Sequence, residues 1–130
     1  KKSMFDIVVP SMLAEHNALS RNLVKVVFSD NGKILYFSRA LVPYDYLDIK
    51  NNYYRDLSIV SFKYDALKKY NNFKQGKIEK IEGIELIRAI ENNLNLGTFK
   101  ATNSGFAVDV NQDLMRAIDL MPTDKIRKLY

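Results

Sequence analysis

Three charged side chains stand where they could act on an anionic ligand or a metal ion. Asp109 follows the apolar residues 106–108 and precedes a helical pattern that begins at Asn111. Ligands of open α/β sheets bind beyond the carboxyl ends of strands, so a carboxylate there can hold a metal ion. Arg39 follows a strand-like run, and its planar fork could bind a phosphate or a carboxylate. Glu85 lies in a helical run whose apolar neighbours face the core.

Each of these residues also has a purely structural interpretation. Asp109 could cap the helix that follows it. Arg39 could form a salt bridge at the end of its strand, and Glu85 could be solvated on the polar side of its helix. Residue type and spacing leave these alternatives open.

Several other kinds of chemistry are excluded by composition. The chain has no cysteine, which excludes disulfides, zinc–thiolate sites and thiol nucleophiles. His16 is the one histidine and falls in a segment expected at the surface, without a serine partner for a catalytic triad. The five glycines are isolated, so neither a P-loop nor a GxGxxG pattern is present.

The charge balance favours anionic partners. Twenty Lys and Arg residues against fifteen Asp and Glu give a net charge of +5, which suits nucleotides, phosphates and acidic sugars. The lysines are spread along the chain and no known nucleic-acid-binding motif is present, so we expect no nucleic-acid partner. No apolar run approaches the roughly 20 residues that span a bilayer, and no signal peptide opens the chain. We therefore expect no membrane partner and a cytoplasmic location.

The elements that must position these side chains alternate between strands and helices. Residues 11–19 are read as a short helix or a loop. The Asn31-Gly32 pair predicts a hairpin between the second and third strands. The order indicates an α/β fold, a sheet covered by helices, with residues 1–130 as a single domain. Apolar patterns predict strands over 5–9, 23–28, 33–37, 56–62, 96–101 and 106–108, and helices over 64–71, 81–92, 111–120 and after Pro122.

Residues 38–54 interrupt this pattern. They carry Pro43 and four of the eight tyrosines, and show no clear period. Tyrosines at this density are typical of an interface. Residues 40–54 therefore form either a long loop or, as we expect, a dimerisation arm.

Four segments, in order, resemble one family. They are VKVVFSDNGKILYFSRALVPYD (24–45), YYRDLSIVSFKYDALKKY (53–70), IEKIEGIELIRAIENN (78–93) and SGFAVDVNQDLMRAI (104–118). They are similar to the C-terminal half of the CMP-Kdo synthetases (3-deoxy-manno-octulosonate cytidylyltransferases), colinearly over residues 5–120. The resemblance implies a nucleotide-diphospho-sugar transferase-like α/β fold, a mixed sheet covered by helices, of which this chain holds only the C-terminal half.

The resemblance also implies an activity and roles for individual residues. It implies a Mg²⁺-dependent homodimer that converts CTP and an acidic 2-keto sugar such as Kdo into CMP-sugar and pyrophosphate, for lipopolysaccharide or capsule biosynthesis. By position, Asp109 would bind magnesium, Arg39 would lie in the sugar site and Glu85 would contact sugar hydroxyls. Residues 40–54 would lie in the dimer interface.

The chain departs from the family in the sugar pocket. A sugar-binding histidine of the family is Asp56 here, and a sugar-contacting tyrosine is Phe62. The glutamine after the helix glutamate is Leu86, and the Thr-Pro after the metal aspartate is residues 110–111. Either a different acidic sugar or a degenerate enzyme fits these changes.

Half of the family's catalytic machinery has no counterpart in these residues. The family's N-terminal half carries its phosphate loop and most of the CTP site. We therefore expect no turnover by this chain alone. The alternative hypothesis is a non-catalytic, dimerising interaction module derived from the same fold.

Overall fold

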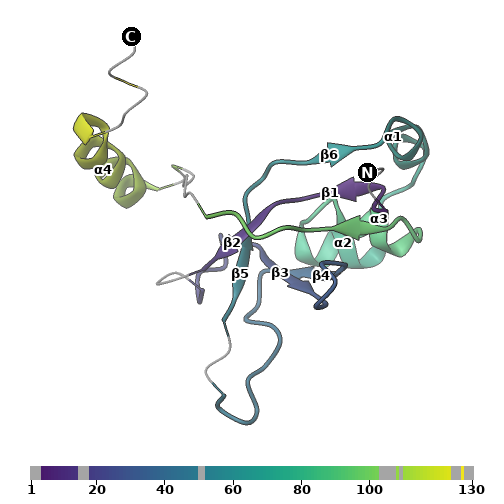
Figure 1. The fold of residues 1–130 in the computed structure, drawn as a ribbon, viewed down its shortest axis with the longest axis horizontal. Coiled ribbons are helices and arrows are strands. Elements are labelled where there is room, and N and C mark those ends of the chain that lie inside the picture. The colour runs from purple at the N-terminus through teal and green to yellow at the C-terminus, as the bar shows by residue number, and fades with distance from the viewer. Residues whose placement is uncertain are drawn as a thin grey trace.

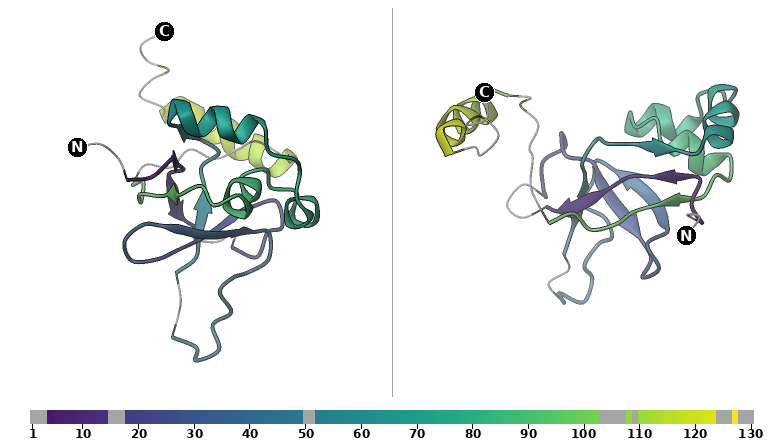
Figure 2. Two further views of the ribbon diagram at one scale, coloured as in Figure 1. Left: turned by 90° about the vertical axis from the view of Figure 1, so that its right-hand side faces the viewer. Right: turned by 45° about the horizontal axis from the view of Figure 1, so that its top comes forward.

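The chain forms two small β-sheets flanked by helices (Figure 1). The computed structural model describes residues 4–14, 18–49, 52–102, 108, 110–123 and 127. In Figure 1 the sheets lie at the centre, helices α1–α3 lie at one end, and α4 lies apart at the other end. The second view of Figure 2 also places α4 away from the sheets.

The larger sheet has four strands in the order β2-β5-β3-β4, all paired antiparallel. Its strands are β2 (Ser11–Leu13), β3 (Lys25–Phe28), β4 (Ile34–Ser38) and β5 (Tyr54–Asp56). The predicted β3–β4 hairpin is confirmed. Gly32 in its turn has a φ of 80°, a conformation that glycine adopts without steric cost.

The smaller sheet has three strands in the order β6-β1-β7. They are β1 (Ile7–Val8), β6 (Ser61–Phe62) and β7 (Leu96–Gly97). β1 runs parallel to β7 and antiparallel to β6. The α/β class is therefore confirmed, but two sheets joined by single bridges, such as Lys33 with Gly97, replace the single mixed sheet that the sequence suggested.

Two predicted elements are wrong because the chain passes from one sheet to the other. Residues 11–13 form strand β2 and do not begin a helix. The predicted strand 56–62 is divided between β5 and β6. Pro10 has no N–H to continue the ladder after β1, and Ser58, with a φ of 56°, turns the backbone after β5.

Three helices follow β6. Helix α1 (Tyr64–Asn71) has the predicted bounds. The predicted helix 81–92 is wrong: the structure has α2 (Lys77–Glu82) and α3 (Ile87–Glu91), separated at Gly83. Gly83 has a φ of 64° and its N–H donates to the Glu79 carbonyl at 2.8 Å, so it closes α2 in the left-handed conformation.

The hydrophobic core lies where both sheets meet the segment 84–89. Phe37 from β4 and Ile7 from β1 are completely buried, and Ile87 is almost so. Each such side chain contributes about 1.5–3 kcal/mol on burial. The other buried members of the cluster are Val9, Val26, Ile34, Ile84, Leu86, Ala89 and Leu96. The core thereby fixes the α2–α3 connection against the ends of β3 and β4.

The C-terminal part contains the helix predicted over 111–120. Helix α4 (Asn111–Leu120) has these bounds, and a 3₁₀ turn (Met121–Thr123) follows it. The strand predicted over 106–108 falls mostly outside the described residues, as do residues 124–126 and 128–130 of the last predicted helix. Among the described residues, none of the helices is long and apolar enough to cross a membrane.

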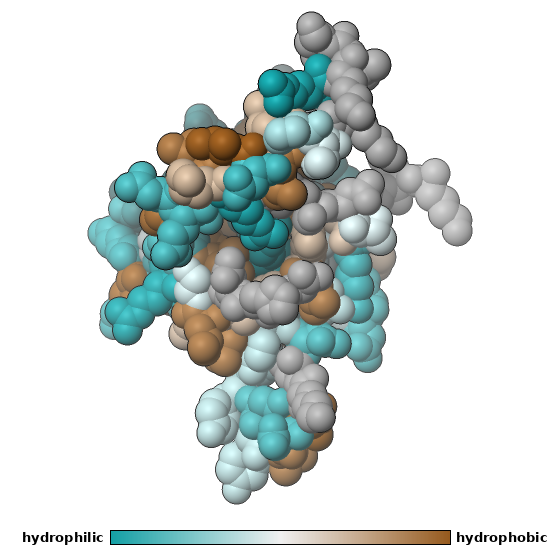
Figure 3. Space-filling model, turned by 90° about the vertical axis from the view of Figure 1, so that its left-hand side faces the viewer, coloured by the Kyte–Doolittle hydropathy of each residue, from teal (hydrophilic) through white to brown (hydrophobic). Residues whose placement is uncertain are grey.

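A long loop connects β4 to β5 and projects away from the sheets at the bottom of Figure 1. Figure 3 shows apolar side chains exposed near its tip, beside polar ones. Tyr44 and Tyr46 are 83% and 85% exposed, and Leu47 and Ile49 are about three-quarters exposed. The described part of residues 40–54 is thus a projecting loop with uncovered apolar side chains.

Candidate functional site

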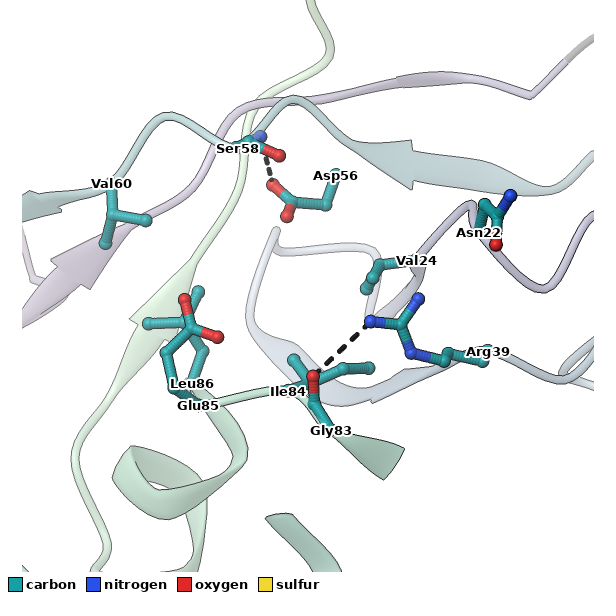
Figure 4. A pocket seen from close by; sticks show the side chains of 10 residues that line it. All are labelled: Asn22, Val24, Arg39, Asp56, Ser58, Val60, Gly83, Ile84, Glu85 and Leu86. Atoms are coloured by element: carbon teal, nitrogen blue, oxygen red, sulfur yellow. Dashed lines mark hydrogen bonds between the residues drawn. The ribbon is translucent and has the colours of Figure 1, made fainter. Parts of the chain in front are cut away.

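A cavity of about 260 Å³ lies between the end of β4, the β5–β6 connection and the α2–α3 connection (Figure 4). Three of the residues singled out from the sequence line it together: Arg39, Asp56 and Glu85. They come from three separate segments of the chain, which the fold brings to one place. The other lining residues are Asn22, Val24, Ser58, Val60, Gly83, Ile84 and Leu86.

Arg39 is held by backbone carbonyls. Its Nε donates to the Glu82 carbonyl at 2.9 Å, its Nη1 to the Arg21 carbonyl at 3.0 Å and its Nη2 to the Gly83 carbonyl at 3.4 Å. Among the described residues these bonds take three of the five guanidinium N–H groups, which leaves two for a ligand. The salt bridge considered for Arg39 is not found among the described carboxylates.

Glu82 attaches the end of α2 to β4. Its Oε1 accepts hydrogen bonds from the Ser38 hydroxyl at 2.8 Å and the Tyr36 hydroxyl at 3.3 Å, and its Oε2 accepts the Arg39 backbone N–H at 2.9 Å. Because α2 ends at Gly83, the carbonyls of residues 82 and 83 become available to the Arg39 side chain. The break in the helix is therefore part of the site.

Lys25 is a buried lysine next to the cavity. It is 1% exposed, and its Nζ donates to the carbonyls of Ser20 at 2.6 Å, Leu23 at 2.9 Å and Arg39 at 2.7 Å. Burial lowers the pKa of Lys25, and the charge of Arg39 lowers it further. The lysine joins segment 20–23, which includes Asn22 of the cavity wall, to the backbone of Arg39.

Asp56 is the last residue of β5. Its backbone N–H donates to the Val24 carbonyl at 3.0 Å, and its Oδ1 accepts the Ser58 N–H at 2.7 Å. Burial raises the pKa of Asp56, the Ser58 hydrogen bond opposes this, and the nearby charge of Glu85 raises the pKa further. Two carboxylates in one cavity thus make each other harder to ionise.

Glu85 lies in the connection between α2 and α3, not in the middle of a helix as the sequence suggested. Its backbone carbonyl accepts the Tyr70 hydroxyl at 3.0 Å, and its side chain is exposed to the cavity. Behind it, Arg88 forms a buried ion pair with Glu79. These contacts hold the connection that presents Glu85.

The remaining two predicted site residues are placed differently. Phe62 lies in β6 with its ring centroid 5.4 Å from that of Tyr70, and is not among the residues that line the cavity. Asp109, the expected magnesium ligand, lies outside the described residues. Within the described residues no three His, Asp or Glu side chains come together to hold a metal ion. The described part therefore offers a ligand cavity and not a metal centre.

The cavity combines one cation with several hydrogen-bond acceptors. The free N–H groups of Arg39 suit a carboxylate, which guanidinium binds with two parallel hydrogen bonds. The carboxylates of Asp56 and Glu85 accept hydrogen bonds from hydroxyl groups, and the Asn22 amide can donate or accept. This set of groups suits a small acid that also carries hydroxyl groups.

Sequence reasoning missed the residues that hold the site together. Lys25 interrupts an otherwise apolar strand, and a lysine in such a run is a usable signal. Gly83 is an isolated glycine within a helical pattern, which is a possible helix end. No signal in the sequence separates Glu82 from the other glutamates of its helix.

A family model described as Cytidylyltransferase matches residues 2–99 of this chain. The 3-deoxy-manno-octulosonate cytidylyltransferase of Rickettsia prowazekii (strain Madrid E) is 34% identical over 130 residues, which cover 99% of this chain and 50% of the relative. The corresponding protein of Leptospira interrogans serogroup Icterohaemorrhagiae serovar Lai is 34% identical over 117 residues, 90% of this chain and 47% of the relative.

A solved structure is also similar to this fold. It is that of CMP:2-keto-3-deoxy-manno-octonic acid synthetase complexed with CTP, with a TM-score of 0.83 and 26% identity. The match covers 92% of this chain and 50% of that one. The chain thus spans about half the length of the curated relatives that it matches.

Proposed function

The chain belongs to the cytidylyltransferase family, and on that premise we propose that it supplies the sugar site of an enzyme that activates an acidic 2-keto sugar. The reaction is that of CTP with a sugar such as Kdo to give CMP-sugar and pyrophosphate, in the cytoplasm, for lipopolysaccharide or capsule biosynthesis. The observation that carries the proposal is that Arg39, Asp56 and Glu85 line one cavity.

The contacts in the cavity support this division of roles. Arg39 is held by three backbone carbonyls and keeps two N–H groups for the sugar carboxylate. Asp56 and Glu85 accept hydrogen bonds from sugar hydroxyls. Orientation of the sugar by these groups prepares its anomeric hydroxyl to attack the α-phosphate of CTP, from which pyrophosphate leaves. The contribution of this chain is positioning.

The nucleotide and the metal ion involve residues beyond the described cavity. We propose Asp109 as one ligand of Mg²⁺, which when bound neutralises phosphate charge. Since the chain spans about half the length of its relatives, we expect no turnover by these residues alone. The test is CMP-sugar formation by the pure chain with CTP, Kdo and Mg²⁺, and measurable synthesis would contradict this expectation.

The sugar site itself is tested by binding. Isothermal titration of the chain with Kdo should show saturable binding, and Arg39→Gln should weaken it about tenfold or more, since a charge-assisted bidentate contact is lost. Arg127→Gln, at an exposed arginine outside the cavity, is the matched control and should leave affinity unchanged. Equal affinity of the Arg39→Gln variant and the unmodified chain would contradict the assignment of Arg39.

The second candidate function is a non-catalytic module that dimerises through residues 40–54. The observation in its favour is the exposure of Tyr44, Tyr46, Leu47 and Ile49 on a projecting loop. In this alternative Asp109→Ala and Arg39→Gln leave every measurable property of the chain intact. In the enzymatic proposal they weaken metal-dependent and sugar binding.

We propose that this loop forms a homodimer interface in either case. Apolar side chains at the tip of a projecting loop are stabilised by burial against a second chain. Leu47→Asp should shift the chain from dimer to monomer in sedimentation experiments, and Leu19→Asp, at another exposed leucine, should not. A monomeric unmodified chain at micromolar concentration would contradict the dimer.

A further inference from the structure

The cavity has the opposite charge bias from the chain as a whole. The chain carries a net charge of +5, but the ionisable residues that line the cavity are two carboxylates, Asp56 and Glu85, and one guanidinium. In Figure 4 these three groups are drawn around the same hollow. A ligand that brought only a carboxylate would satisfy Arg39 and add to the negative charge near the other two.

The positive charge of Arg39 is directed at the protein. Three of its N–H groups donate to backbone carbonyls, and its guanidinium forms no ion pair with a described carboxylate. Arg39 therefore does not neutralise Asp56 or Glu85 within the described part of the chain. Its remaining N–H groups are the natural place for the carboxylate of a substrate.

Asp56 and Glu85 likewise form no ion pair with a described lysine or arginine. Asp56 receives the Ser58 N–H, a neutral donor that leaves its charge in place. Burial and the charge of Glu85 raise the pKa of Asp56, so ionisation of both groups is costly in the empty cavity. A ligand cation between them would remove that cost, whereas a hydroxyl would satisfy hydrogen bonding alone.

We propose that the preferred substrate of this cavity is a zwitterionic amino sugar acid, whose carboxylate binds Arg39 and whose ammonium group binds Asp56 and Glu85. This inference rests on the proposed function and specifies its substrate class. It also gives a chemical meaning to an aspartate at position 56: an anionic acceptor there selects a cationic donor over a neutral one.

Two sets of ligands test the inference. The probes are Kdo and analogues of Kdo in which one hydroxyl at a time is replaced by an amine, titrated into the chain at pH 7 and constant salt. At least one amino analogue should bind about tenfold more tightly than Kdo. An unmodified chain that binds Kdo as tightly as every analogue would overturn the inference.

Variants assign the preference to the two carboxylates. Asp56→Asn keeps the size of the side chain and an oxygen that can accept the Ser58 N–H, and it should abolish the preference for the amine while retaining Kdo binding. Glu85→Gln, at an exposed position that is not expected to affect folding, should reduce the preference in the same way. Asp30→Asn, at an exposed hairpin aspartate outside the cavity, is the control and should preserve it.

The outcomes separate this inference from the proposed function. If Kdo binds and the amine has no advantage, the amino-sugar inference fails and the acidic-sugar site stands. If an amino analogue is preferred but both carboxylate variants keep the preference, the assignment of the ammonium site fails. If neither Kdo nor any analogue binds, the proposed function itself fails.

Discussion

Replacement of Lys25 by methionine should destabilise the protein strongly although it makes the interior more apolar. Lys25 lies in β3, is 1% exposed, and donates hydrogen bonds to three backbone carbonyls. Methionine has a similar length and fills the same space, so the change removes the donors and the charge without opening a large cavity. The variant therefore isolates the effect of the hydrogen bonds.

The magnitude follows from the opposing effects. A hydrogen bond from a charged donor contributes about 1.5–3 kcal/mol, and each buried carbonyl left without a donor costs about 1–3 kcal/mol. Against this, methionine avoids the desolvation of an ammonium group, which is the cost that lowers the pKa of Lys25. We expect a net loss of about 2–4 kcal/mol in the free energy of unfolding. For a chain of this size that corresponds to a fall in Tm of about 10–15 °C.

Urea unfolding followed by circular dichroism measures this loss directly, as a shift in midpoint at unchanged slope. The control is Lys74→Met, the same substitution at an exposed lysine, which should change stability by less than about 0.5 kcal/mol. A loss below about 1 kcal/mol in Lys25→Met would refute the reasoning, because the three carbonyls would then not depend on the lysine.

Three further substitutions have calculable effects. Gly83→Ala should cost about 1–2 kcal/mol in urea unfolding, because its φ of 64° disfavours a Cβ although the space around it is open, and Gly83→Asn should cost less. Arg88 lowers the pKa of Glu79, so Glu79 stabilises the fold at neutral pH and this contribution disappears as the pH falls below about 4.5; unfolding measured from pH 7 to 3 should be less pH-dependent in Glu79→Gln. Burial raises the pKa of Asp56, so its stabilising contribution is complete below pH 3.8 and is lost as the pH rises through the pKa of the folded state. Asp56→Asn should therefore be more stable than the unmodified chain at pH 7 and equal to it near pH 3.8, and a constant difference between the two pH values would contradict this.

Local signals in the sequence predicted the elements that depend on few residues. The β3–β4 hairpin follows from Asn31-Gly32, because that pair adopts the positive φ values of a tight turn. Helix α1 has the predicted bounds because its apolar spacing is not interrupted. The break between α2 and α3 was missed because apolar residues continue at helical spacing on both sides of Gly83. There, tertiary packing of Ile84 and Leu86 in the core outweighs the helical periodicity.

The candidate site was predictable as residue types but not as an arrangement. Arg39 and Glu85 were singled out by their places beside regular elements, and the cavity brings them together with Asp56. The groups that orient them, above all Lys25 and the carbonyls after α2, depend on contacts between distant segments. Such contacts leave no periodic trace in the sequence. The assignments of Phe62 and Asp109 stay predictions.

The central claim is that the cavity between β4, the β5–β6 connection and the α2–α3 connection binds an acidic sugar. The most direct measurement is a titration of the ¹⁵N-labelled chain with Kdo, followed by the chemical shifts of its backbone amides. The account predicts saturable shifts at Ser58, Gly83 and Glu85 that disappear in Arg39→Gln. Saturable shifts confined to residues outside the cavity, or no shifts at millimolar Kdo, would contradict it.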